Sequence, residues 1–221
     1  GHVVDAFTSL VSGRPQPVGL EIAVNLWTQD VTGTLPDLAP PGRSAPAVDT
    51  DAIARAAKLI ASARAPMIVV GSGAQGDAGL VRQLVARTGA PVVAFRTGHG
   101  VMPSDDPLSI GMPVAHSLWT DVDLVIGLGT RLQSQVMSWG HDDDMKIIHI
   151  DIDETQIGRS APVDVGIHAR LADALPLLIS AVENLAYPNP DWADRTADAK
   201  AQRVAQYKEK LGPQLEWLGA I

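Results

Sequence analysis

The sequence contains no cysteine, which excludes disulfide bonds, thiolate metal sites and cysteine nucleophiles. Aromatic residues make up only 4% of the 221 residues. No apolar run approaches the roughly 18 residues that a membrane-spanning helix needs. The opening residues, Gly1 to Asp5, also lack the charged and apolar regions of a signal peptide. From these absences we expect a cytoplasmic location and no membrane partner.

Positive charge is scarce as well. The formal net charge is -8, and the Lys and Arg residues are scattered along the chain, so no nucleic-acid partner is expected. Apolar residues make up 46% of the chain and charged residues 19%, a balance typical of a folded globular protein. Position 1 is not methionine, and we therefore expect this sequence to be a piece of a longer polypeptide.

Short β-branched runs that alternate with helical or loop segments occupy the middle of the chain. These runs are residues 67–70, 91–95, 124–128, 146–150 and, more weakly, 165–167. They are continuously apolar rather than alternating, which is the pattern of strands covered on both faces. The pattern predicts an α/β fold, namely a Rossmann-like, doubly wound sheet of six parallel strands.

The first part of the chain predicts the end of another domain. A helical pattern over 3–11 is followed by a strand-like run over 17–22, and such a pair is too small to bury both of its faces. We therefore interpret residues 1–28 as the tail of a preceding domain. Residues 29–46 are rich in Pro and Gly, which predicts a semi-rigid linker.

The predicted central domain covers residues 47–185. It begins with a helix for which Asp49 and Asp51 are both suitable caps, and it ends with a helix whose apolar residues start at Leu171. Residues 186–221 predict a second linker and then a charged amphipathic helix without a sheet of its own. We interpret them as a linker and the start of a following domain.

Residues Gly71 to Gly76 spell the motif G-x-G-x-x-G directly after the first predicted central strand and before a helix. Glycines at such a turn let the backbone approach a diphosphate, whose charge is met by free N–H groups and the helix dipole. The alternative interpretation is a tight strand-to-helix turn that binds no ligand.

The tip of the next strand, Phe95-Arg96-Thr97-Gly98, lacks the acid that a NAD-binding fold places there for the ribose hydroxyls. Arg96 suits a ribose phosphate instead, so an NADP-dependent oxidoreductase remains an alternative. No acid or base for hydride transfer is evident near it.

Two further strand tips carry polar groups. Gly129 to Arg131 ends one strand, and the Arg131 guanidinium suits a phosphate, with an interdomain salt bridge as the alternative. His149, Asp151 and Asp153 are two residues apart, so in an extended segment they share one side. The acids suit a ribose or an adenine amino group, whereas the alternative is that they cap the next helix.

Other polar groups carry less information. Residues 142–144 form an acidic run that we interpret as a solvated loop, and a hard cation needs more oxygen ligands than the tip at 151–153 offers. His99 and His116 have no Ser or acid partner at a recognisable spacing, and no G-x-S-x-G motif occurs. We predict no catalytic residue and no metal ligand.

The order of these segments resembles the acetolactate synthases and related thiamine-diphosphate enzymes. Gly13 to Ile22 is similar to the closing segment of the pyrimidine-binding domain of that family. The segments that are similar to its central domain, in sequence order, are 71–74, 89–93, 98–100 with Pro103, 106–112, 123–131 and 149–153 with 157–159. The resemblance covers most of the chain.

The resemblance implies a three-domain enzyme that forms or cleaves carbon–carbon bonds of 2-keto acids with thiamine diphosphate and magnesium. Its chemistry lies between the first and third domains, where a glutamate activates the cofactor and a Gly-Asp-Gly motif holds the metal and diphosphate. No Gly-Asp-Gly occurs here, and Glu21 does not match the activating glutamate. The implied partners are the other domains of the same chain and further copies of it, as a dimer or tetramer.

The resemblance also implies a site for FAD or ADP in the central domain. Its residues here are Gly71, Ser72, Gly73, Ala74, Thr97, Gly98, Gly111, Met112, Gly129, Arg131, Asp151, Ile152 and Asp153. Two segments depart from the family pattern: Ile167-His168-Ala169 replaces Gly-Asp-Ala, and Pro113 follows Met112 where flavin enzymes have His-Gly. An occupied site, a vestigial site and a free-standing nucleotide-binding module therefore all stay open.

Overall fold

The computed structural model describes residues 2–30, 33, 45–184 and 190–212. The chain divides into two compact units, Gly1–Pro46 and Ala47–Ile221. Most of the predicted linker 29–46 lies outside the described residues. The first unit contains α1 (His2–Val11), none of whose residues is buried, and the 3-10 helix η1 (Val24–Leu26).

The strand predicted over residues 17–22 is wrong. The segment has no strand assignment, and its apolar side chains Leu20 and Ile22 are 47% and 48% exposed. A strand needs a neighbouring strand to pair its N–H and C=O groups. The described residues of this unit provide no such neighbour, so the β-branched composition alone does not produce a strand.

The second unit contains the predicted six-stranded parallel sheet, in the order β3-β2-β1-β4-β5-β6. The strands are β1 (Pro66–Val70), β2 (Val92–Ala94), β3 (Ser109–Ile110), β4 (Leu124–Leu128), β5 (Lys146–Asp151) and β6 (Val165–His168). Every residue of β1 and β4 is buried, as the continuous apolar runs predicted. The edge strand β3 has only two residues, too few for its apolar pattern to be recognised in the sequence.

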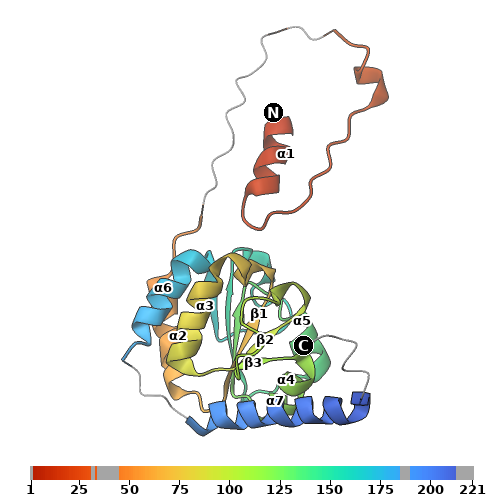
Figure 1. The fold of residues 1–221 in the computed structure, drawn as a ribbon. Helices are drawn as coiled ribbons and strands as arrows, with labels where there is room; N and C mark the ends of the chain where they lie inside the picture. The colour runs from red at the N-terminus through yellow and green to blue at the C-terminus, as the bar shows by residue number, and fades with distance from the viewer. Residues whose placement is uncertain (1, 31–32, 34–44, 185–189, 213–221) are drawn as a thin grey trace. The chain divides into compact units, whose positions relative to one another are not determined.

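Helices cover both faces of the sheet (Figure 1). One face packs on α2 (Thr50–Ser62), α3 (Ala78–Thr88) and α6 (Leu171–Ala181). The other face packs on α4 (Met112–Leu118), α5 (Gln133–Trp139) and the start of α7 (Pro190–Leu211). Adjacent strand residues contribute to different faces, since Ile68 belongs to the first core and Met67 to the second. The doubly wound architecture is confirmed.

Asp49 caps α2. Its carboxylate accepts hydrogen bonds from the N–H groups of Asp51 and Ala52 at 2.9 and 3.0 Å. Of the two caps that the sequence allowed, Asp49 is therefore the one used, because the N-cap side chain satisfies N–H groups of the first turn.

The first half of α7 packs on the central sheet at the amino ends of its strands. The Trp192 indole is 3% exposed and donates to the Pro66 carbonyl at 2.8 Å. The Lys200 ammonium donates to the carbonyls of Ser104 and Asp106 at 2.7 and 2.6 Å. The assignment of 186–221 to a following domain stays a prediction, as do the other domain boundaries. No helix in the described part of the chain is long and apolar enough to cross a membrane.

The strand order reverses between β1 and β4. From β1 the chain moves outward to β2 and β3, and from β4 it moves the opposite way to β5 and β6. In open α/β sheets, ligands bind beyond the carboxyl ends of the strands at such a reversal. The turns that follow β1 and β4 are therefore the first place to look for a functional site.

Candidate functional site at the strand carboxyl ends

The predicted site residues all lie at or just after strand carboxyl ends. Because the sheet is entirely parallel, these ends share one edge of it. The β1 and β4 turns contact each other directly through Gly73 and Gly129, whose N–H and C=O groups are joined at 3.1 Å. The turn after β2 is connected to the β1 turn, and β5 and the loop before β6 to the β4 turn, by the side chains described below.

The glycines after β1 are explained by backbone packing. A Cβ atom on Gly73 would lie 2.7 Å from the Gly129 Cα atom, and one on Gly71 would clash with the Gly129 carbonyl oxygen. The Gly71 N–H donates to the Leu128 carbonyl at 3.2 Å, and the Gly73 N–H is engaged by Gly129. The N–H groups that the motif predicts for a diphosphate are thus largely occupied within the protein.

The segment after this turn also differs from a phosphate-binding helix start. Residues Ser72–Asp77 form the 3-10 helix η2, and α3 begins only at Ala78. The Ala74 N–H donates to the Gly71 carbonyl at 3.2 Å, whereas the Ser72 N–H donates to no residue that the structure describes. Of the interpretations of G-x-G-x-x-G, the tight turn therefore accounts for most of its glycines.

The β4 turn has the opposite arrangement, because all of its carbonyl groups are engaged. The carbonyls of residues 128 and 129 accept from Gly71 and Gly73, and that of Leu132 accepts from the Val136 N–H at 3.1 Å. The Thr130 carbonyl lies 2.7 Å from His149 Nε2, and the Arg131 carbonyl accepts from the Ser160 hydroxyl at 3.1 Å. The turn therefore directs its acceptors into the protein.

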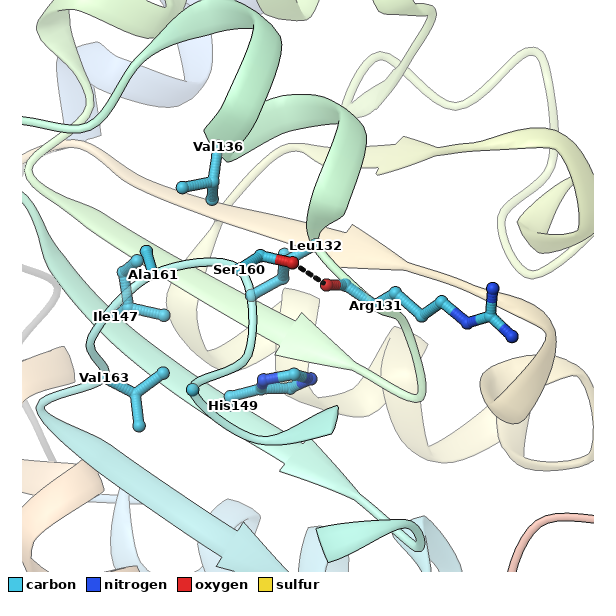
Figure 2. Close-up of a pocket in the computed structure, with 9 residues that line it drawn as sticks. Arg131, Leu132, Val136, Ile147, His149, Ser160, Ala161 and Val163 are labelled. Atoms are coloured by element: carbon cyan, nitrogen blue, oxygen red, sulfur yellow. Dashed lines mark hydrogen bonds between the residues drawn. The ribbon is translucent and has the colours of Figure 1, made fainter. Parts of the chain in front are cut away.

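Two of the four N–H groups of the β4 turn, residues 129–132, are engaged: that of Gly129 donates to the Ile150 carbonyl at 2.9 Å, and that of Leu132 to the Thr130 hydroxyl at 3.4 Å. Among the described residues, the N–H groups of Thr130 and Arg131 have no hydrogen-bond acceptor. The Arg131 side chain is exposed, and it forms no ion pair with the described residues. Figure 2 shows its guanidinium pointing away from His149 and Ser160. Successive free N–H groups beside a cation form a concavity suited to an anion.

Left-handed residues stand at both ends of this turn. Gly129 has a φ of +55°, which suits glycine, but Leu132 has a φ of +54°, which L-residues with large side chains rarely adopt. The Leu132 side chain is 3% exposed and fills the space over Gly127, where a Cβ atom would lie 2.7 Å from it. Burial of this side chain offsets the backbone strain and fixes the turn geometry.

Gln75 connects the β1 turn to the β2 turn. Its amide Nε2 donates to the carbonyls of Thr97 and His99, each at 2.7 Å. Thr97 and Gly98 lie in the 3-10 helix η3 (Arg96–Gly98), and Gly98 is buried against the Val70 carbonyl, where no Cβ atom would fit. Predicted residues of two different turns are thus held together by a side chain that the motif leaves unspecified.

Arg96, the residue on which the NADP alternative depends, lies over the ring of Phe95. Its guanidinium carbon is 5.0 Å from the ring centroid, and its own φ is +46°. A residue held in this left-handed conformation with its guanidinium against a neighbouring ring is not extended toward the β1 turn. The geometry therefore gives this alternative little support.

The acids after β5 take part in local capping. The Asp151 carboxylate accepts from the Asp153 N–H at 2.9 Å, and Asp153 caps the 3-10 helix η5 (Glu154–Gln156) by accepting from the Thr155 N–H at 3.1 Å. The capping interpretation therefore describes their contacts.

His168, which stands where the family pattern has an acid, also has a structural role. His168 Nε2 lies 3.0 Å from the Ile152 carbonyl, and its Nδ1 lies 3.9 Å from the Glu154 carboxylate. The residue that replaces an acid in the family pattern therefore connects β6 to the loop after β5. The Ile152 carbonyl is engaged by this contact.

Gly111 and Met112 lie on the β3 side of the sheet. Gly111 precedes α4 with an ordinary φ of -80°, and a Cβ atom there would make only an ordinary contact of 3.7 Å with the Pro113 Cδ atom. The Met112 sulfur accepts from the Gln135 amide at 3.6 Å, which connects α4 to α5. Neither residue contacts the β4 turn through a hydrogen bond among the described residues.

His149 is the most deeply buried ionisable group of the site, at 1% exposure. Burial lowers the pKa of its imidazole below the usual 6.5, against smaller opposing effects of the Thr130 carbonyl and Asp151. Its ring borders a cavity of about 10 Å³, roughly the room that one water molecule requires. Leu132, Val136 and Ile147 also line this cavity.

Away from this edge, the acidic run 142–144 is a local turn. The Asp142 carboxylate accepts from the N–H groups of Asp144 and Met145 at 3.1 and 2.9 Å. The described residues contain no group of three or more His, Asp or Glu side chains that could hold a metal ion.

Asp77, at the start of α3, has a raised pKa because of burial and the nearby Asp173 carboxylate.

Sequence reasoning missed Gln75, Leu132 and Ser160, each of which fixes one of the turns. Gln75 lies inside the glycine motif, but at a position where the motif allows any residue, so the motif did not single it out. Leu132 and Ser160 gave none, because a left-handed leucine and a hydroxyl contact across 29 residues of sequence follow only from the folded arrangement.

Comparison with known proteins agrees with this architecture. Residues 53–178, more than half of the chain, match the family described as the thiamine pyrophosphate enzyme central domain. The large subunit of acetolactate synthase isozyme 1 from Escherichia coli (strain K12) is 31% identical over 207 residues, which are 90% of this chain and 36% of that protein. The chloroplastic acetolactate synthase 1 of Zea mays is 30% identical over 96% of this chain and 36% of its own length.

A relative with a different name matches at the same level. Glyoxylate carboligase from Escherichia coli O157:H7 is 30% identical over 81% of this chain and 32% of its own length. The chain thus spans about a third of the length of the curated relatives that it matches. On the family match over residues 53–178 and the parallel sheet that these residues form, the chain belongs to the thiamine pyrophosphate enzymes and contains their central domain.

Proposed function

We propose that this domain binds the ADP portion of FAD, or ADP itself, at the carboxyl edge of its sheet, in an enzyme that acts on 2-keto acids. The observation that carries the proposal is the β4 turn, residues 129–132. Its carbonyls are engaged, whereas the N–H groups of Thr130 and Arg131 have no acceptor among the described residues, and the Arg131 guanidinium is exposed. A diphosphate needs donors and positive charge, and this turn supplies both.

The fit of a nucleotide differs between the predicted segments. At the β1 turn, Ser72 has an N–H group without an acceptor among the described residues, so this turn adds one donor beside Arg131. At the β5 end, the carboxylates of Asp151 and Asp153 are acceptors of the kind that suits ribose hydroxyls, and both also take part in local capping. Gly111 and Met112 lie at the start of α4, and none of their contacts among the described residues supports a role in nucleotide binding.

The catalytic role of the whole polypeptide is also part of the proposal. Thiamine diphosphate, when bound with magnesium, supplies the carbanion chemistry for forming or cleaving the carbon–carbon bond of a 2-keto acid. Acetolactate synthases and a glyoxylate carboligase are similar to this chain along most of its length. We assign no residue of this chain to that chemistry, and its contribution is to position the other domains and the nucleotide.

Titration calorimetry with ADP tests the nucleotide site. We expect ADP to bind the 221-residue chain, and Arg131→Ala to weaken binding by roughly 10- to 100-fold, the effect of losing a charge-assisted hydrogen bond to phosphate. The matched control is Arg64→Ala, because Arg64 is exposed before the amino end of β1, where it pairs with Asp123 at 3.6 Å. It changes the net charge equally and should leave ADP affinity unchanged.

Parallel titrations with FAD and NADP decide between the alternatives. Binding of FAD and ADP with similar loss in Arg131→Ala supports the proposal, whereas binding of NADP alone supports the oxidoreductase alternative. If none of the three nucleotides binds or raises the melting temperature, the site is vestigial and the proposal for this edge is wrong.

The enzymatic part needs the product of the complete gene. We expect its mass to exceed twice the 23.3 kDa of this chain, because the relatives are about three times as long. Supplied with thiamine diphosphate and Mg²⁺, it should consume a 2-keto acid such as pyruvate and sediment as a dimer or tetramer. A complete gene product of about 23 kDa would contradict this part of the proposal.

A further inference from the structure

We propose that His149 and Ser160 act together as positioning residues, holding the carbonyls of Thr130 and Arg131 inward so that the β4 turn presents the N–H group and guanidinium of Arg131 to a ligand phosphate. This inference rests on the proposed nucleotide site and names residues to which neither the family pattern nor the motifs assign a role. His149 comes from β5, and Ser160 from the loop before β6.

The two contacts act on adjacent peptide groups. His149 Nε2 lies 2.7 Å from the Thr130 carbonyl oxygen, and the Ser160 hydroxyl donates to the Arg131 carbonyl at 3.1 Å. Each carbonyl belongs to the same peptide unit as the following N–H group. Fixing the Thr130 carbonyl therefore fixes the plane of the Arg131 N–H, since a peptide group is planar.

One further contact touches these two peptide groups, since the Leu132 N–H donates to the Thr130 hydroxyl at 3.4 Å. Gly73 engages the Gly129 carbonyl, and the Gly129 N–H donates to the Ile150 carbonyl at 2.9 Å, so the start of the turn is fixed by backbone. Its end is fixed by the buried Leu132 side chain. Between these ends, the only carbonyl contacts among the described residues are those from His149 and Ser160.

The environment of His149 suits this role. Its ring is 1% exposed, so water does not compete for its contact with Thr130. Figure 2 shows the imidazole and the Ser160 hydroxyl on the inner side of the turn, while the Arg131 side chain extends to the other side. In the neutral ring the Nε2–H tautomer donates to the carbonyl, and the hydrophobic cavity beside it disfavours the charged ring.

Amide hydrogen exchange tests the positioning without any ligand. In His149→Leu and Ser160→Ala, which remove one donor each, we expect faster exchange at residues 129–133 than in the wild-type chain, with the change carried by the hydrogen-bonded N–H groups of Gly129 and Leu132. His149→Gln keeps a donor at a similar reach and should restore protection. The matched control is Thr196→Val, which removes a buried hydroxyl that donates to the Trp192 carbonyl at 2.8 Å at the opposite edge of the sheet. It should leave exchange at 129–133 unchanged.

Affinity for ADP then tests whether the positioning serves the ligand. We expect about tenfold weaker binding for His149→Leu and for Ser160→Ala, with recovery in His149→Gln and no change in Thr196→Val. Unchanged exchange at 129–133 in both donor-removing variants would overturn the inference, and so would unchanged affinity in a wild-type chain that binds ADP. If the wild-type chain binds no nucleotide, the proposed function fails, and the exchange result alone decides the role of His149 and Ser160.

Discussion

The turns after β1 and β4 face each other across the point where the strand order reverses, yet their backbone groups are engaged in different ways. The β1 turn has the recognisable G-x-G-x-x-G sequence, and the N–H groups of Gly71 and Gly73 are used to hold Leu128 and Gly129. The β4 turn has only Gly129 in common with such motifs, and its carbonyls are engaged while the N–H groups of Thr130 and Arg131 have no acceptor among the described residues. The glycine motif therefore marks the place where two backbones approach closely. The hydrogen-bond pattern decides which N–H groups of these backbones are available to a ligand.

The largest expected effect is a loss of stability on substitution of Gly73, which should distinguish this glycine from Gly76 of the same motif. Gly73→Ala places a Cβ atom 2.7 Å from the Gly129 Cα atom, and backbone on both sides leaves little room to move. We expect the free energy of unfolding to fall by about 2–3 kcal/mol, the upper end of ordinary single substitutions. Urea denaturation of the purified variant measures this change.

Gly76→Ala is the matched control within the same motif. No atom lies within 4 Å of its missing Cβ, and its φ is not left-handed. We expect a change within about 0.5 kcal/mol of the wild type. If both variants lost stability equally, the packing explanation of the β1 turn would be wrong, and the whole motif would require another cause.

Gln75 provides the next largest effect. Gln75→Ala removes the amide that donates to the Thr97 and His99 carbonyls, so the β2 turn loses its connection to the β1 turn. We expect a loss of about 1 kcal/mol, because the freed groups are exposed to water, which replaces the hydrogen bonds in part. Faster amide exchange at 96–100, with no change at 129–133, would localise the effect to the β2 side of the comparison.

Much of this architecture could be predicted from the sequence, because continuous apolar runs such as 124–128 and 146–150 determine buried parallel strands. The site could be predicted only as a set of strand ends. The availability of a peptide N–H depends on partners distant in sequence, such as His149, which fixes the Thr130 carbonyl and with it the Arg131 N–H, and no local pattern encodes that. The wrong strand at 17–22 has the same origin, since pairing requires a neighbour that β-branched residues do not specify.

Acid pH should weaken the β4 side through His149. Its folded-state pKa lies below the usual 6.5 because the ring is buried, so the unfolded chain takes up this proton first as the pH falls. The contribution is fully present above about pH 6.5 and is lost progressively as the pH drops toward the folded-state value. His149→Gln should flatten this part of the stability curve between pH 7 and 5, measured as the difference from wild type at each pH. A difference that stays constant over that range would contradict the assignment.

The smallest effect concerns Asp77, where α3 follows the β1 turn. Burial and the neighbouring Asp173 carboxylate raise the pKa of Asp77 above its usual 3.8, so the folded state holds this proton more tightly than the unfolded state. Its charged form therefore costs stability at neutral pH, a cost that disappears as the pH falls below 3.8. We expect Asp77→Asn to raise the melting temperature slightly at pH 7 and to lose this advantage in acid. A lower melting temperature at pH 7 would mean that the charged Asp77 carboxylate stabilises the start of α3, next to the β1 turn.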